Sequence, residues 1–391
     1  MVEERHNIIS QRAINIPPSG IRKFFDLSAS VPGIISLGVG EPDYVTPWHI
    51  SEAAISAIKK GYTMYTSNYG LADLRQELSR HLSNRYNVDY DPKTEIIVTS
   101  GASEALDIAM RAVIDPGDEV IVGDPTYVAY IPCITMPGGV PVTVPTSIDD
   151  DFEMKASEIE KRITPKTKAI LLGNPNNPTG AVIEKDELVK IATLVEKYDL
   201  VVISDEIYDR LVYDGTHTCF ASLTSMKERT ITCGGFSKSY AMTGWRVGYV
   251  CAPAEIIEAM MKVHQYIMMC APIMGQIGAT EALQNGEDSV LEMVADYNRR
   301  RRVIVSGLND IGLTCYMPKG AFYAFPSIKS TGLTSDEFAE KLLLEEHVVV
   351  VPGSVFGQCG DGHIRCCYAV ALPDIEEALT RIRRFVKNYG K

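Results

Sequence analysis

The stretch that decides the fold is "KAILLGNPNNPTGAVIEKDELVKIATLVEKYDLVVISDE", Lys168 to Glu206. It begins with an apolar run, passes through a loop of proline, asparagine and glycine, continues with apolar residues at helical spacing, and ends on a second apolar run. Parallel strands need a crossover connection, usually a helix, so this order indicates a strand, helix, strand unit. Similar runs surround it, namely "TEIIVTSG", "EVIVGDP", "VPVTVP", "RTITCGG" and "VGYVCAP". Such near-continuous apolar strands predict an α/β domain whose mostly parallel sheet is covered by helices on both faces.

The pattern changes after Pro253, where long helical stretches precede the strand runs "GAFYAFP", "HVVVVPG" and "HIRCCYA". Mixed strands and helices predict a smaller α+β domain, which the N-terminal segment joins. We expect a large domain over 46–285 and a small domain built from 1–45 and 286–391. The first helix of the large domain is expected to begin in "TPWHISEAAISAIKKG", with Thr46 as its N-cap and Pro47 at its first helical position.

Composition and charge exclude several functions for this chain of 391 residues. Its net charge of -12 argues against binding to nucleic acid or to an anionic membrane, and we interpret the arginine run 299–302 as a solvated, ion-paired helix face. Nine cysteines without a CxxC pair and seven histidines without ligand spacing predict neither a disulfide framework nor a metal site. The N-terminus lacks a signal peptide pattern and no segment is apolar enough to span a membrane, so a cytoplasmic protein is expected.

Chemically useful groups follow the strand runs, and ligands of open parallel sheets bind at the carboxyl ends of the strands. In "TSGASEAL", Gly101, Ala102 and Ser103 lie between a strand and the start of a helix, where free amides favour a phosphate. A glycine turn with a serine cap is the simpler interpretation of this motif taken alone. The stiff loop "GNPNNPTGAV" directs Asn177 towards a ligand, although it could also be a plain turn.

Two charged residues complete this set. Asp205 ends the buried run "LVVISDE", so it needs a cation or several hydrogen-bond donors, with a helix cap as an equal alternative. Lys238, in "GGFSKSYAMTGWRVGY", lies between two buried runs, and burial lowers the pKa of a lysine and frees its amine for Schiff-base chemistry. Together the groups specify a ligand with a phosphate, a basic ring nitrogen and an aldehyde. Pyridoxal phosphate has all three.

The motifs "SLGVGEPD", "YTSNYGLADLR", "NPNNPTG", "SDEIY", "SKSYAMTGWRVGY" and "HIRCCYA" occur in an order that is highly specific. On them, the chain resembles the pyridoxal-phosphate enzymes of fold type I, namely the class I aminotransferases of the aspartate and aromatic amino acid kind. The resemblance spans nearly the whole sequence. It implies a seven-stranded sheet in the large domain, a small domain that closes over the substrate, and a homodimer with shared active sites.

The resemblance also implies roles for individual residues. Lys238 forms the Schiff base with the cofactor and moves the substrate's α-proton, and Asp205 keeps the pyridine nitrogen protonated. Tyr208 and Asn177 hydrogen-bond the phenolic oxygen. Tyr127 stacks on the cofactor ring, and Tyr65 reaches the phosphate of the neighbouring subunit. The phosphate cup is formed by Gly101, Ala102, Ser103, Ser237 and Arg246.

Substrate recognition follows from the same resemblance. Arg365 grips the α-carboxylate, and Gly40 and Asn177 complete that pocket. The chain departs from the family pattern at Tyr127, where many aspartate aminotransferases have tryptophan, and at Ser103, where some have a lysine for the distal carboxylate. The second departure favours an aromatic or other large L-amino acid as donor over aspartate, with 2-oxoglutarate as acceptor.

The segments "HNIIS" and "SGIRKFFDLS" near the N-terminus resemble the part that closes over substrates. Arg22 within the second segment could supply a distal charge, or it could be a solvated arginine on a short helix.

Two alternative functions remain open. The first is another reaction on the same cofactor, such as β-elimination by a C-S lyase, because small geometric differences decide the outcome after α-proton loss. The second is a pyridoxal-phosphate-binding transcriptional regulator, which needs an added DNA-binding domain and fits poorly with the acidic charge.

Overall fold

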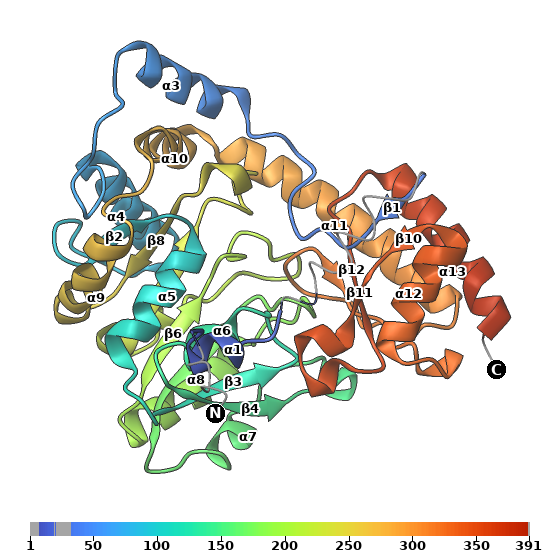
Figure 1. Ribbon diagram of the computed structural model, residues 1–391. Coiled ribbons are helices and arrows are strands. Elements are labelled where there is room, and N and C mark those ends of the chain that lie inside the picture. Colours follow the sequence, from blue (N-terminus) through green and yellow to red (C-terminus); the bar gives the residue numbers. More distant parts are fainter. Residues whose placement is uncertain (1–7, 19, 21–32, 390–391) are drawn as a thin grey trace, which may run out of the picture.

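The computed structural model describes residues 8–18, 20 and 33–389 and is built round a seven-stranded sheet (Figure 1). The strand order is β2-β8-β7-β6-β5-β3-β4, and β8 alone runs in the direction opposite to the other strands. The predicted mostly parallel sheet is therefore confirmed. The strand bounds are Ile96–Thr99 for β2, Glu119–Asp124 for β3, Val140–Pro145 for β4, Thr167–Gly173 for β5, Val201–Asp205 for β6, Thr230–Gly235 for β7 and Gly248–Cys251 for β8.

Helices cover both faces of the sheet because alternate strand residues point to opposite sides. On β3, Val120 and Val122 pack with α5 and α9, whereas Ile121 packs with α7 and α8. A third apolar cluster joins the β2 and β8 edge to α3, α4 and α10. The helix bounds are Trp48–Lys59 for α3, Ala72–Tyr86 for α4, Ala102–Val113 for α5, Tyr130–Thr135 for α6, Ala156–Glu160 for α7, Lys185–Lys197 for α8, Ala254–Ile267 for α9 and Ile273–Asn285 for α10.

The C-terminal part forms a separate apolar cluster beside the sheet domain, drawn in orange and red in Figure 1. Its long helix α11 begins directly after α10, and short strands pack between its helices, as expected for a small α+β domain. Leu37, from the N-terminal segment, belongs to the same cluster. The bounds are Ile35–Ser36 for β1, Glu287–Asp310 for α11, Tyr323–Ala324 for β9, Ser335–Glu346 for α12, Val348–Val349 for β10, Val351–Pro352 for β11, Ile364–Cys367 for β12 and Leu372–Tyr389 for α13.

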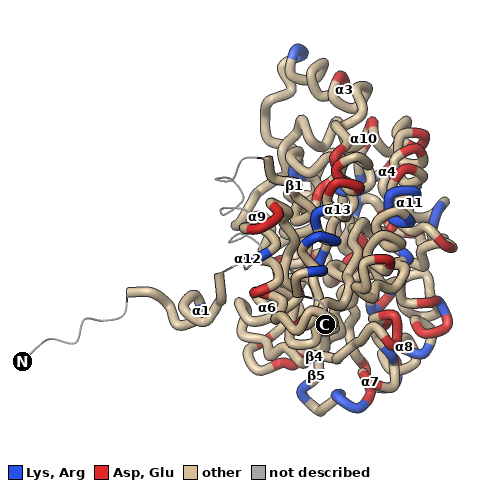
Figure 2. Tube along the Cα trace, turned by 90° about the vertical axis from the view of Figure 1, so that its right-hand side faces the viewer, with Lys and Arg blue, Asp and Glu red and all other residues tan. Residues whose placement is uncertain are grey.

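The short helix α1 (Gln11–Ile14) projects from the body of the molecule in Figure 2, and its Arg12 guanidinium donates to the Met136 carbonyl at 3.4 Å. The segment "SGIRKFFDLS", with Arg22, lies outside the described residues except for Gly20, and so do the first two residues of "HNIIS". Among the helices of the described ranges, none is both long and apolar enough to cross a membrane.

The prediction that Thr46 caps the first helix of the large domain is wrong. Helix α3 begins at Trp48 after Pro47, and Thr46 makes no capping bond. The Thr46 hydroxyl instead donates to the Ala241 carbonyl at 2.6 Å and accepts from the Trp245 indole at 2.9 Å, because this tertiary position offers both a donor and an acceptor. Thr46 therefore ties the start of the domain to the loop after Lys238.

The arginine run on α11 is ion-paired as predicted, but half of it is not solvated. Arg300 and Arg301 are 7% and 2% exposed, since α11 packs against the sheet domain and the small domain on that face. Arg300 pairs with Asp43, and Arg301 pairs with Asp214. The buried cations are retained because each has a carboxylate and a backbone carbonyl as partners.

Candidate active site

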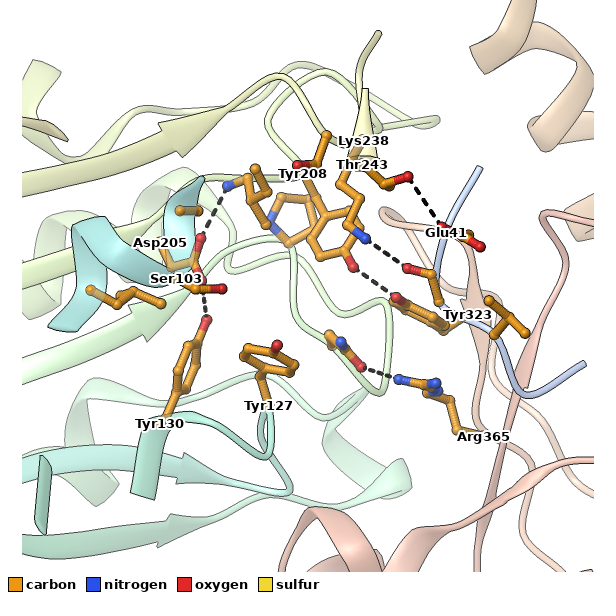
Figure 3. Close-up of a pocket in the computed structure, with 18 of the residues that line it drawn as sticks. Glu41, Ser103, Tyr127, Tyr130, Asp205, Tyr208, Lys238, Thr243, Tyr323 and Arg365 are labelled. Carbon is orange, nitrogen blue, oxygen red and sulfur yellow. Dashed lines mark hydrogen bonds between the residues drawn. The ribbon is translucent and has the colours of Figure 1, made fainter. Parts of the chain in front are cut away.

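A cavity of about 510 Å³ opens at the carboxyl ends of the parallel strands (Figure 3). Both domains contribute to its wall, since β6, α5 and the loop after β7 supply one side and β9 and β12 supply the other. Its size and mixed lining are those of a small-molecule site. Eleven of the residues singled out from the sequence line it, namely Gly40, Ala102, Ser103, Tyr127, Asn177, Asp205, Tyr208, Ser237, Lys238, Arg246 and Arg365.

Lys238 follows β7 in the turn that leads to β8, so its side chain projects into the cavity from the sheet edge. Its ammonium group donates to the Gly40 carbonyl at 2.6 Å and lies 5.7 Å from the ring centre of Phe322. Burial lowers the pKa of this amine to about 8, with the nearby Arg365 and Arg246 acting in the same direction. A lysine of this kind carries a substantial neutral fraction near neutral pH, which a nucleophilic amine requires.

Asp205 ends β6 and is 5% exposed. One carboxylate oxygen accepts from the Tyr130 hydroxyl at 2.8 Å, and the other accepts from the Ile207 amide at 3.2 Å. Burial raises the pKa of this carboxyl to about 6 in spite of these donors. Its described partners are all neutral, so a cationic ligand group in the cavity would complete its surroundings.

The N-terminus of α5 meets the cavity beside Arg246. Gly101, at φ 85, precedes the helix, and no side chain of the described residues caps the first amides. The Arg246 guanidinium donates to the Ser100 carbonyl at 3.3 Å, and a Cβ added to Gly101 would lie 2.6 Å from it. Glycine is therefore needed both for the backbone angle and for the close approach of the arginine. Free helix amides next to an arginine form an anion site.

Arg365, on β12, lies at the other end of the cavity and is 2% exposed. It donates to the Asn177 side-chain oxygen at 2.9 Å and to the Gly38 carbonyl at 2.7 Å, while its Nε has no partner among the described residues. The rings of Tyr323 and Phe356 lie 4.5 and 5.0 Å from the guanidinium carbon. This arrangement holds the planar fork rigidly and leaves donor capacity for a carboxylate.

Tyrosine hydroxyls line the middle of the cavity. Tyr208, after β6, and Tyr323, on β9, share a hydrogen bond of 2.7 Å that crosses from one domain to the other. The Tyr323 hydroxyl also explains Gly40, because a Cβ there would lie 2.6 Å from it. Tyr127 stands edge-on to Tyr130, with ring centres 5.5 Å apart.

Two predicted positions lie off the cavity wall. Gly101 sits behind Ala102 and acts through the backbone, whereas Tyr65 is 81% exposed and contributes nothing to the cavity of its own chain. Sequence analysis missed several lining residues, among them Tyr130, Tyr323, Glu41 and Thr243. Tyr130 carried a signal, because it stands in the same "DPTYVAY" motif as Tyr127. No pattern in the sequence marked Tyr323 as a site residue, because "GAFYAFP" is typical of any buried strand.

The residues fit pyridoxal phosphate on three independent observations. The buried Asp205 carboxylate has no cationic hydrogen-bond partner among the described residues, the uncapped amides of α5 lie beside Arg246, and a buried lysine with a lowered pKa lines the same cavity. These features match a ring nitrogen, a phosphate and an aldehyde respectively.

Comparisons with known proteins agree with this geometry. Residues 32–382 match the family described as aminotransferase class I and II. The chain is 54% identical over 378 residues to the Bacillus subtilis protein YugH, covering 97% of this chain and 98% of that one. It is 44% identical to aromatic-amino-acid aminotransferase 2 of Thermococcus litoralis, over 97% and 98% of the two chains.

Among solved structures, Thermus thermophilus aspartate aminotransferase with maleate superposes with a TM-score of 0.92 at 36% identity, over 96% of this chain and 99% of that one. The protein is therefore an aminotransferase and belongs to the class I and II aminotransferase family.

Proposed function

We propose that the protein is a pyridoxal-phosphate-dependent transaminase that moves the amino group of an L-amino acid to a 2-oxo acid by a ping-pong mechanism. The observation that carries the proposal is the convergence of Lys238, Asp205 and Arg365 on one cavity. The three groups are a nucleophilic amine, a carboxylate without a cation and a carboxylate receptor. A transaminase needs one group of each kind, to bind the aldehyde, the ring nitrogen and the substrate carboxylate respectively.

Lys238 is proposed to act twice. Its neutral amine would hold the cofactor, and after a substrate amine had taken that place the same nitrogen would take the substrate's α-proton. When bound, pyridoxal phosphate supplies an aldehyde for the amine and a ring that withdraws electrons from the α-carbon. The lowered pKa of Lys238 suits both tasks, because general bases work best with a pKa near the working pH.

Asp205 is proposed to hold a proton on the ring nitrogen, with Tyr130 fixing the carboxylate by its hydroxyl. Tyr208 and Asn177 are proposed to donate to the phenolic oxygen, and Tyr127 to stack on the ring. Gly101, Ala102, Ser103, Ser237 and Arg246 are proposed as the phosphate cup. Arg365, with Gly40 and Asn177, is proposed to bind the substrate's α-carboxylate.

The cavity favours a donor without a distal carboxylate. Among the described lining residues the cations are Lys238, Arg246 and Arg365, and each has a proposed partner already. Ser103 adds only a hydroxyl. We therefore propose an aromatic or other large L-amino acid as donor, the class that the name of the Thermococcus litoralis relative states. If 2-oxoglutarate is the acceptor, its second carboxylate needs a cation from beyond these lining residues.

A homodimer is proposed as the working unit, with Tyr65 reaching the phosphate of the other subunit. Large apolar side chains are exposed in the single chain next to Tyr65 and elsewhere, with Met64 75%, Trp48 68% and Tyr266 87% exposed. Exposure of this kind is typical of surfaces that bind another protein. Sedimentation of the holoenzyme tests this proposal, and a monomer with full activity would contradict it.

The test of the function is a panel of L-amino acids added singly to the holoenzyme without an oxo acid. An aromatic donor is expected to bleach the visible absorbance and release one 2-oxo acid per site, and a 2-oxo acid is then expected to restore the absorbance. Release of pyruvate and ammonia from cysteine conjugates, without amino transfer, would show a C-S lyase instead. No response to any donor, with salt-sensitive DNA binding, would indicate a regulator.

A further inference from the structure

A buried histidine lies behind the proposed phosphate cup with no assigned role. His264, on α9, is fully buried, and its Nδ1 lies 2.6 Å from a carboxylate oxygen of Glu104, on α5. The pair is held where α9 packs along α5 (Figure 1). The second Glu104 oxygen accepts the backbone amide of Ser100. The Nε2 of His264 has no partner among the described residues.

The position of Glu104 conflicts with a phosphate site at the start of α5. It stands in the first turn of α5, so its carboxylate lies close to the free amides that a phosphate would use. A carboxylate there competes for these amides and repels the phosphate charge. In the structure the carboxylate turns away from Ala102 and Ser103 and binds Ser100 instead.

His264 explains this orientation. In the tautomer that carries its proton on Nδ1, the imidazole donates to one Glu104 oxygen and leaves the other for the Ser100 amide. The backbone of Ser100 is then held at two atoms, because its amide donates to Glu104 and its carbonyl accepts from Arg246. The chain of contacts runs from His264 through Glu104 and Ser100 to the arginine of the cup.

We propose that His264 and Glu104 are positioning residues for the phosphate cup, with His264 holding the Glu104 carboxylate away from the phosphate. The inference rests on the proposed cofactor and adds that the affinity for its phosphate, and not for its ring, depends on a residue remote from the cavity. His264 is absent from the cavity wall, so any effect of its removal passes through Glu104.

Substitutions at His264 separate this role from packing. Asparagine places an amide donor near the position of Nδ1, whereas leucine fills the space without a donor. We expect His264→Leu to weaken binding of pyridoxal 5'-phosphate to the cofactor-free full chain by about tenfold or more, because a largely buried carboxylate loses one of its two partners. His264→Asn is expected to stay within about threefold of the wild type, because it keeps that donor.

Pyridoxal, which lacks the phosphate, is the second probe. Its affinity is expected to be the same in the wild type and in His264→Leu within about twofold, since the cup does not bind it. Adding Glu104→Gln to His264→Leu is expected to restore phosphate-dependent affinity, because the amide still accepts from Ser100 and carries no charge. Asp107→Asn, on the same helix in an exposed pair with Arg111, is the matched control and is expected to change neither affinity.

Each outcome decides the proposal. Equal losses in His264→Leu and His264→Asn, equal losses for both probes, or no loss at all would overturn it. If the leucine variant does not fold, His264→Gln takes its place, because its amide reaches the Nε2 position and not Glu104. A wild-type chain that binds neither probe at Lys238 would instead overturn the proposed function.

Discussion

Asp205 and Glu206 are adjacent buried carboxylates whose surroundings differ completely. They point to opposite sides of the end of β6, and they are 5% and 3% exposed. Glu206 accepts from the Ser204 hydroxyl at 2.9 Å and the Phe220 amide at 3.0 Å, and its other oxygen lies 2.8 Å from Nε2 of the buried His217. Asp205 faces the cavity with two neutral donors and no cation of its own.

The difference separates a structural carboxylate from a functional one. Glu206 has its countercharge within the chain, so its burial is compensated when the protein folds. Asp205 lacks one, and the pKa of its carboxyl is raised to about 6 by burial. A chain tolerates such a group where a ligand completes it, and perturbed groups of this kind cluster at functional sites. Three substitutions and one pH series test this difference between Asp205 and Glu206.

The largest effect is expected from Asp205→Asn. The amide cannot hold a proton on the ring nitrogen, so turnover should fall by roughly 1000-fold, the scale of a lost electrostatic contact in a transition state. The free energy of unfolding of the cofactor-free chain should stay constant or rise, because a buried charge without a countercharge is removed. Steady-state kinetics and denaturant unfolding check the two parts. A large loss of stability would place Asp205 in the same class as Glu206.

Glu206→Gln is expected to show the reverse pattern. Breaking a buried ion pair should lower the free energy of unfolding by roughly 3 kcal/mol at pH 6, where His217 is charged. Turnover at a temperature where the variant is folded should change little. Urea denaturation followed by kinetics measures both, and a turnover loss as large as that of Asp205→Asn would contradict the assignment.

The stability gap between the wild type and Glu206→Gln should depend on pH. Burial alone lowers the pKa of His217, but the Glu206 carboxylate more than offsets this and raises the pKa above its usual value. A raised histidine pKa gives stability that is complete below about pH 6.5 and is lost as the pH rises through the folded-state value. The gap should therefore narrow from pH 6 to pH 9 in paired unfolding curves. A gap that widens with pH would show that His217 is not charged in the pair.

The smallest effect is expected from Tyr130→Phe. Removing one neutral donor should cost about 1 kcal/mol of cofactor affinity, about fivefold, and should raise the pKa of Asp205 further. Titration of the cofactor-free chain with pyridoxal 5'-phosphate measures the change. Tyr198→Phe, which removes a hydroxyl from an exposed contact with Glu160, serves as its control. An effect of Tyr130→Phe as large as that of Asp205→Asn would make the tyrosine, and not the carboxylate, the principal group.

The sequence predicted the parts of the site that lie next to strand ends. Asp205, Lys238 and Asn177 each follow an apolar run, so their arrival at one sheet edge follows from parallel topology. Arg365 lies within a buried run, and only the family resemblance marked it. The apolar runs predicted a mostly parallel sheet and a smaller α+β domain, and the resemblance supplied the number of seven strands.

Other features depend on tertiary contacts that no local pattern encodes. Tyr323 meets Tyr208 only because the small domain docks on the sheet domain, and Arg301 pairs with Asp214 for the same reason. The sequence around Thr46 is typical of a helix cap, but its hydroxyl instead bonds to Ala241 and Trp245, which lie far along the chain. His264 and Glu104 are about 160 residues apart, and their pairing follows from the packing of α9 on α5.

The central claim is that the buried amine of Lys238 carries the cofactor, with Asp205 opposite. Borohydride reduction of the holoenzyme, followed by peptide mapping by mass spectrometry, tests it most directly. One reduced pyridoxyl phosphate group is expected per chain, on the peptide that contains Lys238, and none is expected in Lys238→Ala. A label on any other lysine, or a fully active Lys238→Ala enzyme, would contradict the account.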